Sequence, residues 1–137
     1  MTRWERFNHR DMAYSKWHRW LGDDITMVDI DAVEYCNKCN KVLAVMELAN
    51  DHDQVSKPFL MTLQVAKALN ASGYVVLYTA DESLPPEDCM IKFRVMKVWP
   101  EISGFNEVSP EDYGNWIKEI HASCCRDKKG IQDDPEC

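Results

Sequence analysis

Two apolar runs separated by one helical segment constrain the fold of this chain more than any other feature. Residues 41–48 are almost continuously apolar, and residues 74–79 read Tyr-Val-Val-Leu-Tyr-Thr, which is typical of a strand buried on both faces. Residues 58–69 between them carry apolar side chains at helical spacing, and Asn-Ala-Ser-Gly follows. A strand, a helix and a strand in this order predict a crossover connection within one sheet.

The flanking segments add two more predicted strands. Residues 25–35 alternate polar and apolar side chains, and the polar residues 36–40 predict a turn that joins them to the first apolar run as a β-hairpin. Residues 90–99 alternate in the same way after a loop that contains Pro85-Pro86. The sequence therefore predicts four strands.

Helices are predicted at both ends of the chain. The pattern Thr2-x-x-Glu5 fits a capping box for a helix over residues 3–21, and Ser109-Pro110 predicts the start of a helix that ends near Ala122. The element order is then α-β-β-α-β-β-α. This order predicts an α/β (α+β) fold with a mixed central β-sheet flanked by helices.

The net charge of −7 over 137 residues is unevenly distributed. Residues 1–20 carry +3 and residues 21–123 carry −9. We expect residues 1–123 to form a single domain and the charged residues 124–137 to form a disordered tail. The acidic balance excludes a generic basic nucleic-acid binder.

The sequence gives no sign of a membrane or secreted protein. Its longest apolar stretches run only a few residues, and the N-terminal sequence MTRWERFNHR lacks the apolar segment of a secretory signal. The six cysteines are then expected to be reduced thiols. These features predict a cytoplasmic protein with no membrane partner.

The first 20 residues interleave basic and aromatic side chains. Such a segment suits DNA, because Arg and Lys contact phosphates while rings stack on bases. The alternative is an amphipathic helix in which the rings of Tyr14, Trp17 and Trp20 belong to the core. The candidate DNA-binding residues are Arg3, Arg6, Arg10, Lys16, His18 and Arg19.

Acidic side chains on the predicted hairpin are candidate metal ligands. Asp29 and Asp31 lie on the first strand, and Glu47 follows five apolar residues on the second. A charge within an apolar strand is costly unless it has a function. Carboxylates on neighbouring strands can converge on a hard cation such as Mg²⁺ or Mn²⁺, which polarises a phosphate and lowers the pKa of an attacking water.

The hairpin and the strands after it resemble the PD-(D/E)XK nuclease superfamily over about residues 3–99. The segments that carry the resemblance are Met27–Tyr35, Val42–Ala49, Gly73–Thr79 and Phe93–Val95. Asn8-His9-Arg10 and Trp17-His18-Arg19 are similar to segments of small phage-encoded members. The resemblance implies a restriction-endonuclease-like core and metal-dependent hydrolysis of DNA phosphodiesters.

The resemblance also implies roles for single residues. Asp31 (or Asp29) and Glu47 would bind the metal, but Ala49 stands where the family has a lysine that orients or activates water. Either another residue substitutes for this lysine or catalysis is lost. The nearest lysines are Lys57 and Lys67, and Gln64 lies on the following helix, where relatives often place a polar active-site residue.

Two functions stay open at this stage. One is a metal-dependent nuclease that acts on DNA. The other is a catalytically inactive protein with the nuclease fold that binds a host protein or nucleic acid as a phage accessory factor. Ala49 and the acidic bulk favour the second, because acidic surfaces attract basic protein partners. For a phage-encoded chain, the expected location is the cytoplasm of the bacterial host.

Cys36-x-x-Cys39 on the predicted turn has the spacing of half a zinc knuckle. A tetrahedral zinc site needs two more ligands. The alternatives are a redox pair, which more commonly opens a helix, and two ordinary thiols. The candidates for the remaining zinc ligands are Cys89, His18, His52, His121 and the pair Cys124-Cys125.

Overall fold

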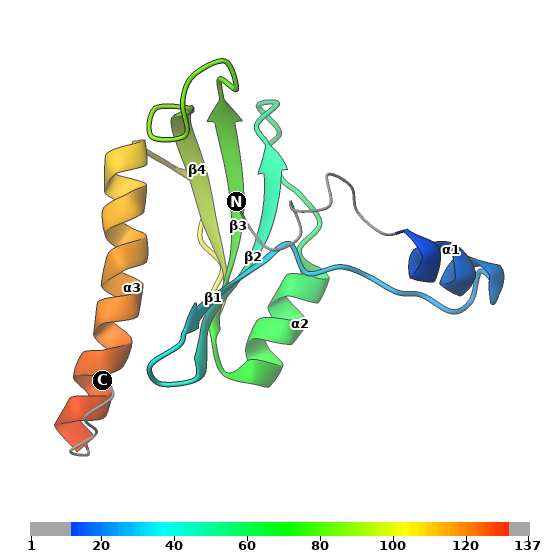
Figure 1. Cartoon of the computed structure of the whole chain (residues 1–137), viewed down its shortest axis with the longest axis horizontal. Coiled ribbons are helices and arrows are strands. Elements are labelled where there is room, and N and C mark those ends of the chain that lie inside the picture. Colours follow the sequence, from blue (N-terminus) through cyan, green and yellow to red (C-terminus); the bar gives the residue numbers. More distant parts are fainter. Residues whose placement is uncertain (1–11, 132–137) are drawn as a thin grey trace.

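The computed structural model describes residues 12–131 of the chain, with side chains through residue 125 (Figure 1). It contains three helices and five strands in the order α-β-β-α-β-β-β-α. Their bounds are α1 Ala13–Trp20, β1 Ala32–Cys36, β2 Lys41–Asn50, α2 Leu60–Leu69, β3 Ser72–Ala80, β4 Met90–Trp99, β5 Asn106–Val108 and α3 Pro110–Ile131.

The five strands form one sheet in the order β1-β2-β3-β4-β5. Strands β2 and β3 are parallel and are joined by α2, whereas the other neighbouring pairs are antiparallel. The predicted mixed sheet flanked by helices is therefore confirmed. A restriction-endonuclease-like core stays a prediction.

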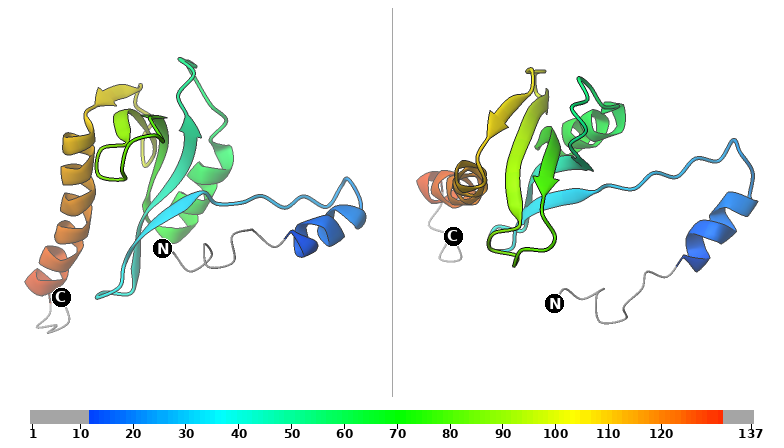
Figure 2. Two further views of the ribbon diagram at one scale, coloured as in Figure 1. Left: turned by 45° about the horizontal axis from the view of Figure 1, so that its top comes forward. Right: turned by 90° about the horizontal axis from the view of Figure 1, so that it is seen from above.

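Helices α2 and α3 cover opposite faces of the sheet (Figures 1 and 2). The side chains of β3 alternate between these faces, as the period of a strand requires. Val75 and Leu77 pack toward α2 with Met96 and Val98, and Leu63 of α2 contacts this cluster. The cluster on the α3 face contains Ala44, Met46, Tyr74, Val76 and Phe93.

Aromatic rings attach α3 to its face of the sheet. The Tyr113 ring stacks on Phe93 with ring centroids 3.9 Å apart, and Trp116 meets Tyr74 edge-on at 4.8 Å. Burial raises the pKa of Tyr113 to about 12, and the nearby carboxylate of Glu34 adds to this shift. These contacts hold the N-terminal half of α3 against the sheet.

The α2 helix packs tightly against the sheet at Gly73, the second residue of β3. A Cβ atom at this position would lie 3.0 Å from Ala66 Cβ and 3.2 Å from Val98 Cγ2. We expect Gly73→Ala to destabilise the fold by about 1–3 kcal/mol, because helix and sheet have to separate. Urea unfolding measures this loss. The control is Gly104→Ala, where no atom lies within 4 Å, and an equal loss in both variants would contradict the close packing.

Two predicted element boundaries are wrong. The predicted strand over residues 25–35 joins the sheet only from Ala32, because the exposed residues before it have neither a covering layer nor a partner strand among the described residues. The last helix continues to Ile131 instead of ending near Ala122. The disordered tail stays a prediction, and its residues 132–137 lie outside the described residues. The short strand β5 was not predicted, because three residues show no clear periodicity.

The α1 helix lies apart from the sheet, at the end of an extended segment (Figures 1 and 2). None of its residues is buried, and the side chains of Trp17 and Trp20 are 52% and 80% exposed. The prediction that its rings belong to the core is therefore wrong. Residues 3–11 of the predicted first helix lie outside the described residues.

Candidate active site and metal sites

The sheet register brings Asp31 next to Glu47. Ala32 pairs with Met46, so Asp31 comes opposite Glu47 at the end of the β1–β2 ladder. Oδ2 of Asp31 accepts a hydrogen bond from the backbone N–H of Leu48 at 2.9 Å. Glu47 points to the α2 face, since the neighbouring Met46 and Leu48 pack on the α3 face. Asp31 and Glu47 are therefore neighbours in register at the end of the β1–β2 ladder.

Lys57 reaches the same place from the loop before α2. Its Nζ lies 2.9 Å from Oε1 of Glu47, and the two side chains are 26% and 25% exposed. Partial burial strengthens such a pair relative to an ion pair in open water. We call Asp31, Glu47 and Lys57 the carboxylate–lysine site.

The other residues of the implied motif lie elsewhere. Ala49 packs against the apolar cluster on the α2 face, together with Phe59 and Leu63. Lys67 lies near the end of α2 with its Nζ 5.4 Å from the centroid of the Trp99 ring. Gln64 is exposed on α2. Of the two lysines considered as substitutes, the structure places Lys57 and not Lys67 against Glu47.

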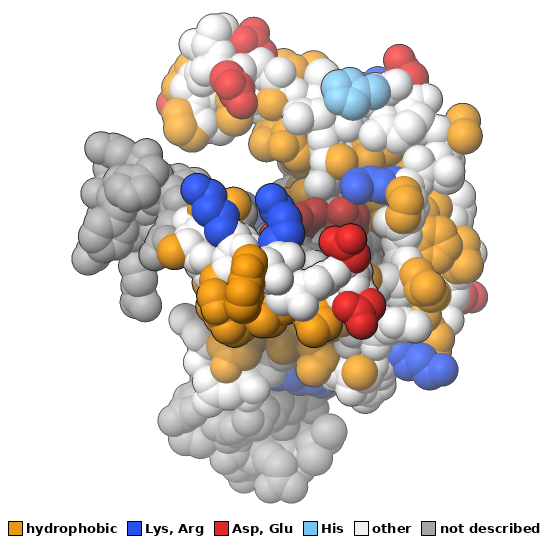
Figure 3. Space-filling view, turned by 90° about the vertical axis from the view of Figure 1, so that its right-hand side faces the viewer, with side chains coloured by type: hydrophobic (Ala, Val, Ile, Leu, Met, Phe, Trp, Pro, Cys, Tyr) orange, Lys and Arg blue, Asp and Glu red, His pale blue; other side chains and the backbone are white. Residues whose placement is uncertain are grey.

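Asp29 lies closer to α1. It lines a cavity of about 380 Å³ together with His18 and Arg19 of that helix. Figure 3 shows the side of the molecule that is at the right in Figure 1. Lys and Arg side chains lie beside Asp and Glu side chains around a hollow near the centre of this view. Lys16 is exposed on α1. Of the candidate DNA-binding residues, Arg3, Arg6 and Arg10 lie outside the described residues.

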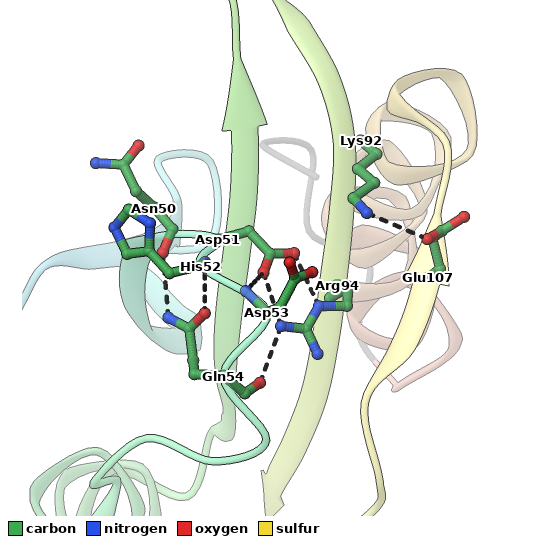
Figure 4. A network of polar contacts seen from close by, with 8 residues as sticks. All are labelled: Asn50, Asp51, His52, Asp53, Gln54, Lys92, Arg94 and Glu107. Carbon is green, nitrogen blue, oxygen red and sulfur yellow. Dashed lines mark hydrogen bonds and ion pairs between the residues drawn. The ribbon is translucent and has the colours of Figure 1, made fainter.

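A charged network fixes the start of the loop that carries Lys57 (Figure 4). Arg94 of β4 donates through Nε and Nη2 to the two carboxylate oxygens of Asp51, at 2.8 and 2.7 Å. Its Nη2 also donates to the backbone carbonyl of Gln54 at 2.9 Å. The side chain of Gln54 closes the loop, with Nε2 donating to the carbonyl of Asn50 and Oε1 accepting from the N–H of His52.

The Asp51–Arg94 pair is the main polar feature that sequence analysis missed. The Asp51 side chain is only 2% exposed although it lies in a loop. The side-chain hydrogen bonds from Arg94 hold the pKa of Asp51 far below its ordinary value, and the same bonds raise the pKa of Arg94. No local signal marks this pair, because Arg94 is one of three basic residues in β4, with Lys92 and Lys97.

Four cysteines gather where the β1–β2 turn meets α3. The sulfur atoms of Cys36, Cys39 and Cys124 lie within 4.8 Å of one another and could hold a metal ion. Cys125 Sγ lies 3.9 Å from Cys39 Sγ. Cys36 is buried, and the other three are half-buried. We call these four residues the cysteine cluster; they are Cys36, Cys39, Cys124 and Cys125.

The pKa values of two thiols of the cysteine cluster are shifted in opposite directions. The pKa of Cys36 is lowered mainly because the backbone N–H of Cys39 donates to its sulfur at 3.4 Å. The pKa of Cys124 is raised mainly by burial. Cys39 is disulfide-bonded, so the expectation that the cysteines are reduced thiols is wrong for this residue, whereas Cys36, Cys89, Cys124 and Cys125 are free.

Only some of the candidate zinc ligands lie near Cys36 and Cys39 in the structure. Of these candidates, Cys124 and Cys125 lie next to Cys36 and Cys39. His121 instead lies 2.9 Å from the carboxylate of Glu34. His52 belongs to the loop after β2, His18 lies on α1, and Cys89 directly precedes β4; none of these three joins the group that could hold a metal.

Comparison of the chain with protein-family models, with curated proteins and with solved structures found no match. Among the described residues, no helix is both long enough and apolar enough to cross a bilayer.

Proposed function

We propose that this protein is a divalent-metal-dependent nuclease that hydrolyses DNA phosphodiesters at the carboxylate–lysine site. The observation that carries the proposal is the contact of Lys57 with Glu47. The PD-(D/E)XK resemblance calls for a lysine at the position of Ala49. In its place, Lys57 brings an ammonium to Glu47 from the loop before α2. As a second and separate cofactor, we propose zinc at Cys36 and Cys39, because thiolate ligands suit this metal.

The donor atoms of the site fit Mg²⁺ or Mn²⁺. Asp31 and Glu47 offer oxygen ligands from adjacent strands, and Mg²⁺ in phosphoryl-transfer sites is commonly held by one or two carboxylates together with substrate phosphate and water. When bound, the cation supplies Lewis acidity to the phosphodiester and lowers the pKa of water. Among the described residues, the only group of three or more His, Cys, Asp or Glu side chains close enough together to hold a metal ion is Cys36, Cys39 and Cys124, so Asp31 and Glu47 would bind the cation as a pair.

The protein's own groups have distinct tasks in this proposal. The backbone N–H of Leu48 holds the Asp31 carboxylate in place. The Lys57 ammonium is compensated by Glu47 in the free protein and offers N–H donors to the attacking water and to the negative charge that develops on the phosphoryl oxygens. Lys16, His18 and Arg19 would contact the DNA backbone from α1, the helix that lies apart from the sheet (Figure 1).

The test is cleavage of supercoiled plasmid and branched DNA in the presence of Mg²⁺ or Mn²⁺. We expect the wild-type protein to cut with either metal and to stop when the metal is chelated. The Glu47→Ala variant is expected to fall to the level without metal, because the metal loses one of its two carboxylates. Glu107→Ala is the matched control, since this glutamate is 68% exposed on β5 and pairs with Lys92 at 3.6 Å.

Two outcomes would reject the nuclease. One is a folded wild-type protein that cuts none of these substrates, and the other is a Glu47→Ala variant that cuts as fast as the wild type. Specific binding of DNA or of a basic protein without cleavage would instead support the inactive nuclease-fold protein. The observation that favours this alternative is Ala49, whose side chain belongs to the apolar cluster under α2.

A further inference from the structure

The C-terminal half of α3 meets the β1–β2 turn through polar and sulfur contacts. His121, Cys124 and Cys125 are spaced three and four residues apart, so they lie on one side of the helix. His121 Nε2 lies 2.9 Å from Oε1 of Glu34 on β1. One turn further along α3, the cysteine pair lies against the Cys-x-x-Cys turn.

The sulfur positions match the dimensions of a tetrahedral thiolate site. A zinc ion with four Zn–S bonds of about 2.3 Å separates its sulfur atoms by about 3.8 Å. The separation between Cys39 and Cys125 is 3.9 Å, and the sulfur atoms of Cys36, Cys39 and Cys124 lie within 4.8 Å of one another. Three sulfur atoms are thus already close enough for one ion, and that of Cys125 lies beside one of them, Cys39.

The turn itself is shaped for a metal-bound sulfur. The backbone N–H of Cys39 already points to the Cys36 sulfur at 3.4 Å. Hydrogen bonds of this kind orient a ligand and stabilise its charged form. Cys36 is 4% exposed, which shields the site from solvent.

We propose that, in the reduced chain, Cys36, Cys39, Cys124 and Cys125 form a closed four-thiolate zinc site that fixes the C-terminal half of α3 to the β1–β2 turn. The inference deepens the zinc part of the proposed function by naming all four ligands, and it is independent of the nuclease part. Four protein ligands leave no open position, so the zinc is structural.

Two chemical steps lead to this site. The disulfide of Cys39 first accepts two electrons and two protons from a dithiol, which becomes a disulfide itself and leaves two protein thiols. The four cluster thiols then release four protons to water as their sulfur atoms bind one Zn²⁺. The product carries a net charge of −2 on the ZnS₄ unit. Zinc binding thus requires reducing conditions and weakens as the pH falls.

The experiment measures zinc in the full-length protein after reduction with a water-soluble phosphine. We expect one zinc per chain after removal of free metal, and a Co²⁺-loaded sample with the visible absorption of tetrahedral sulfur coordination. Cys125→Ser is expected to weaken zinc binding at least about tenfold, since it removes a direct ligand. Cys89→Ser is the matched control, because Cys89 is also free but lies outside the cluster.

A second readout guards against misfolded variants. Zinc is expected to raise the melting temperature of the reduced wild type and of Cys89→Ser by at least about 5 °C, and to leave that of Cys125→Ser nearly unchanged. A reduced wild type that retains no zinc overturns the proposal, as does a Cys125→Ser variant that binds zinc as tightly as the wild type. Glu47→Ala should keep its zinc, so failure of the nuclease and failure of the zinc site are told apart.

Discussion

Replacement of Lys57 by methionine is expected to reduce the rate of metal-dependent DNA cleavage by about 10²–10³-fold. Methionine keeps the length of the side chain but removes the ammonium that lies 2.9 Å from Glu47. Without it, the negative charge of the transition state has no cationic partner from the protein. The proposed metal ligands Asp31 and Glu47 are unchanged, so the variant should still require Mg²⁺ or Mn²⁺. Single-turnover rates at saturating metal measure the loss.

A lysine returned to the position of Ala49 provides the decisive control for this prediction. Residues 47 and 49 share one face of β2, since side chains two residues apart on a strand point the same way. We expect Lys57→Met combined with Ala49→Lys to recover at least about tenfold of the lost rate, because the ammonium then approaches the site from the strand. A Lys57→Met variant with the wild-type rate would show that the ion pair is structural only.

The sequence predicted the carboxylates of this site better than its lysine. Glu47 stood out because a charge inside an apolar strand is costly, and its register with Asp31 follows from the hairpin. Which lysine approaches Glu47 depends on the path of the loop after β2. That path is set by the bridge from Asp51 to Arg94, two residues that are 43 positions apart and show no local pattern.

In the fold, too, the elements that local sequence patterns determine were predicted, whereas those that depend on contacts between distant segments were not. The α2 helix and the strands on either side of it follow from periodicity, and all three were predicted. Residues 25–31 alternate like a strand, but alternation stabilises a strand only where a neighbour and a covering layer exist. The extension of α3 to Ile131 places Cys124 and Cys125 against the β1–β2 turn, a contact that no short segment of sequence reveals.

Replacement of Asp51 by asparagine is expected to destabilise the fold by about 3 kcal/mol at neutral pH. The substitution removes the charge that compensates Arg94 and weakens two hydrogen bonds of 2.7 and 2.8 Å, while the arginine remains 19% exposed. The loop before Lys57 also loses its anchor to β4. Urea unfolding at neutral pH measures the loss, and Asp88→Asn, an exposed loop aspartate, is expected to change stability by less than about 0.5 kcal/mol.

The difference between wild type and Asp51→Asn is also expected to depend on pH. Because hydrogen bonds from Arg94 hold the pKa of Asp51 well below its ordinary value of 3.8, the unfolded chain binds a proton at this carboxylate before the folded protein does. The stabilisation is therefore complete above about pH 5 and declines as the pH falls below about 4 toward the pKa of the folded state. Unfolding midpoints should differ between the two proteins by the same amount at about pH 7 and pH 5 and by less at about pH 3. A difference that stays constant down to about pH 3 would contradict a charged, arginine-bound Asp51 and would assign its role to packing alone.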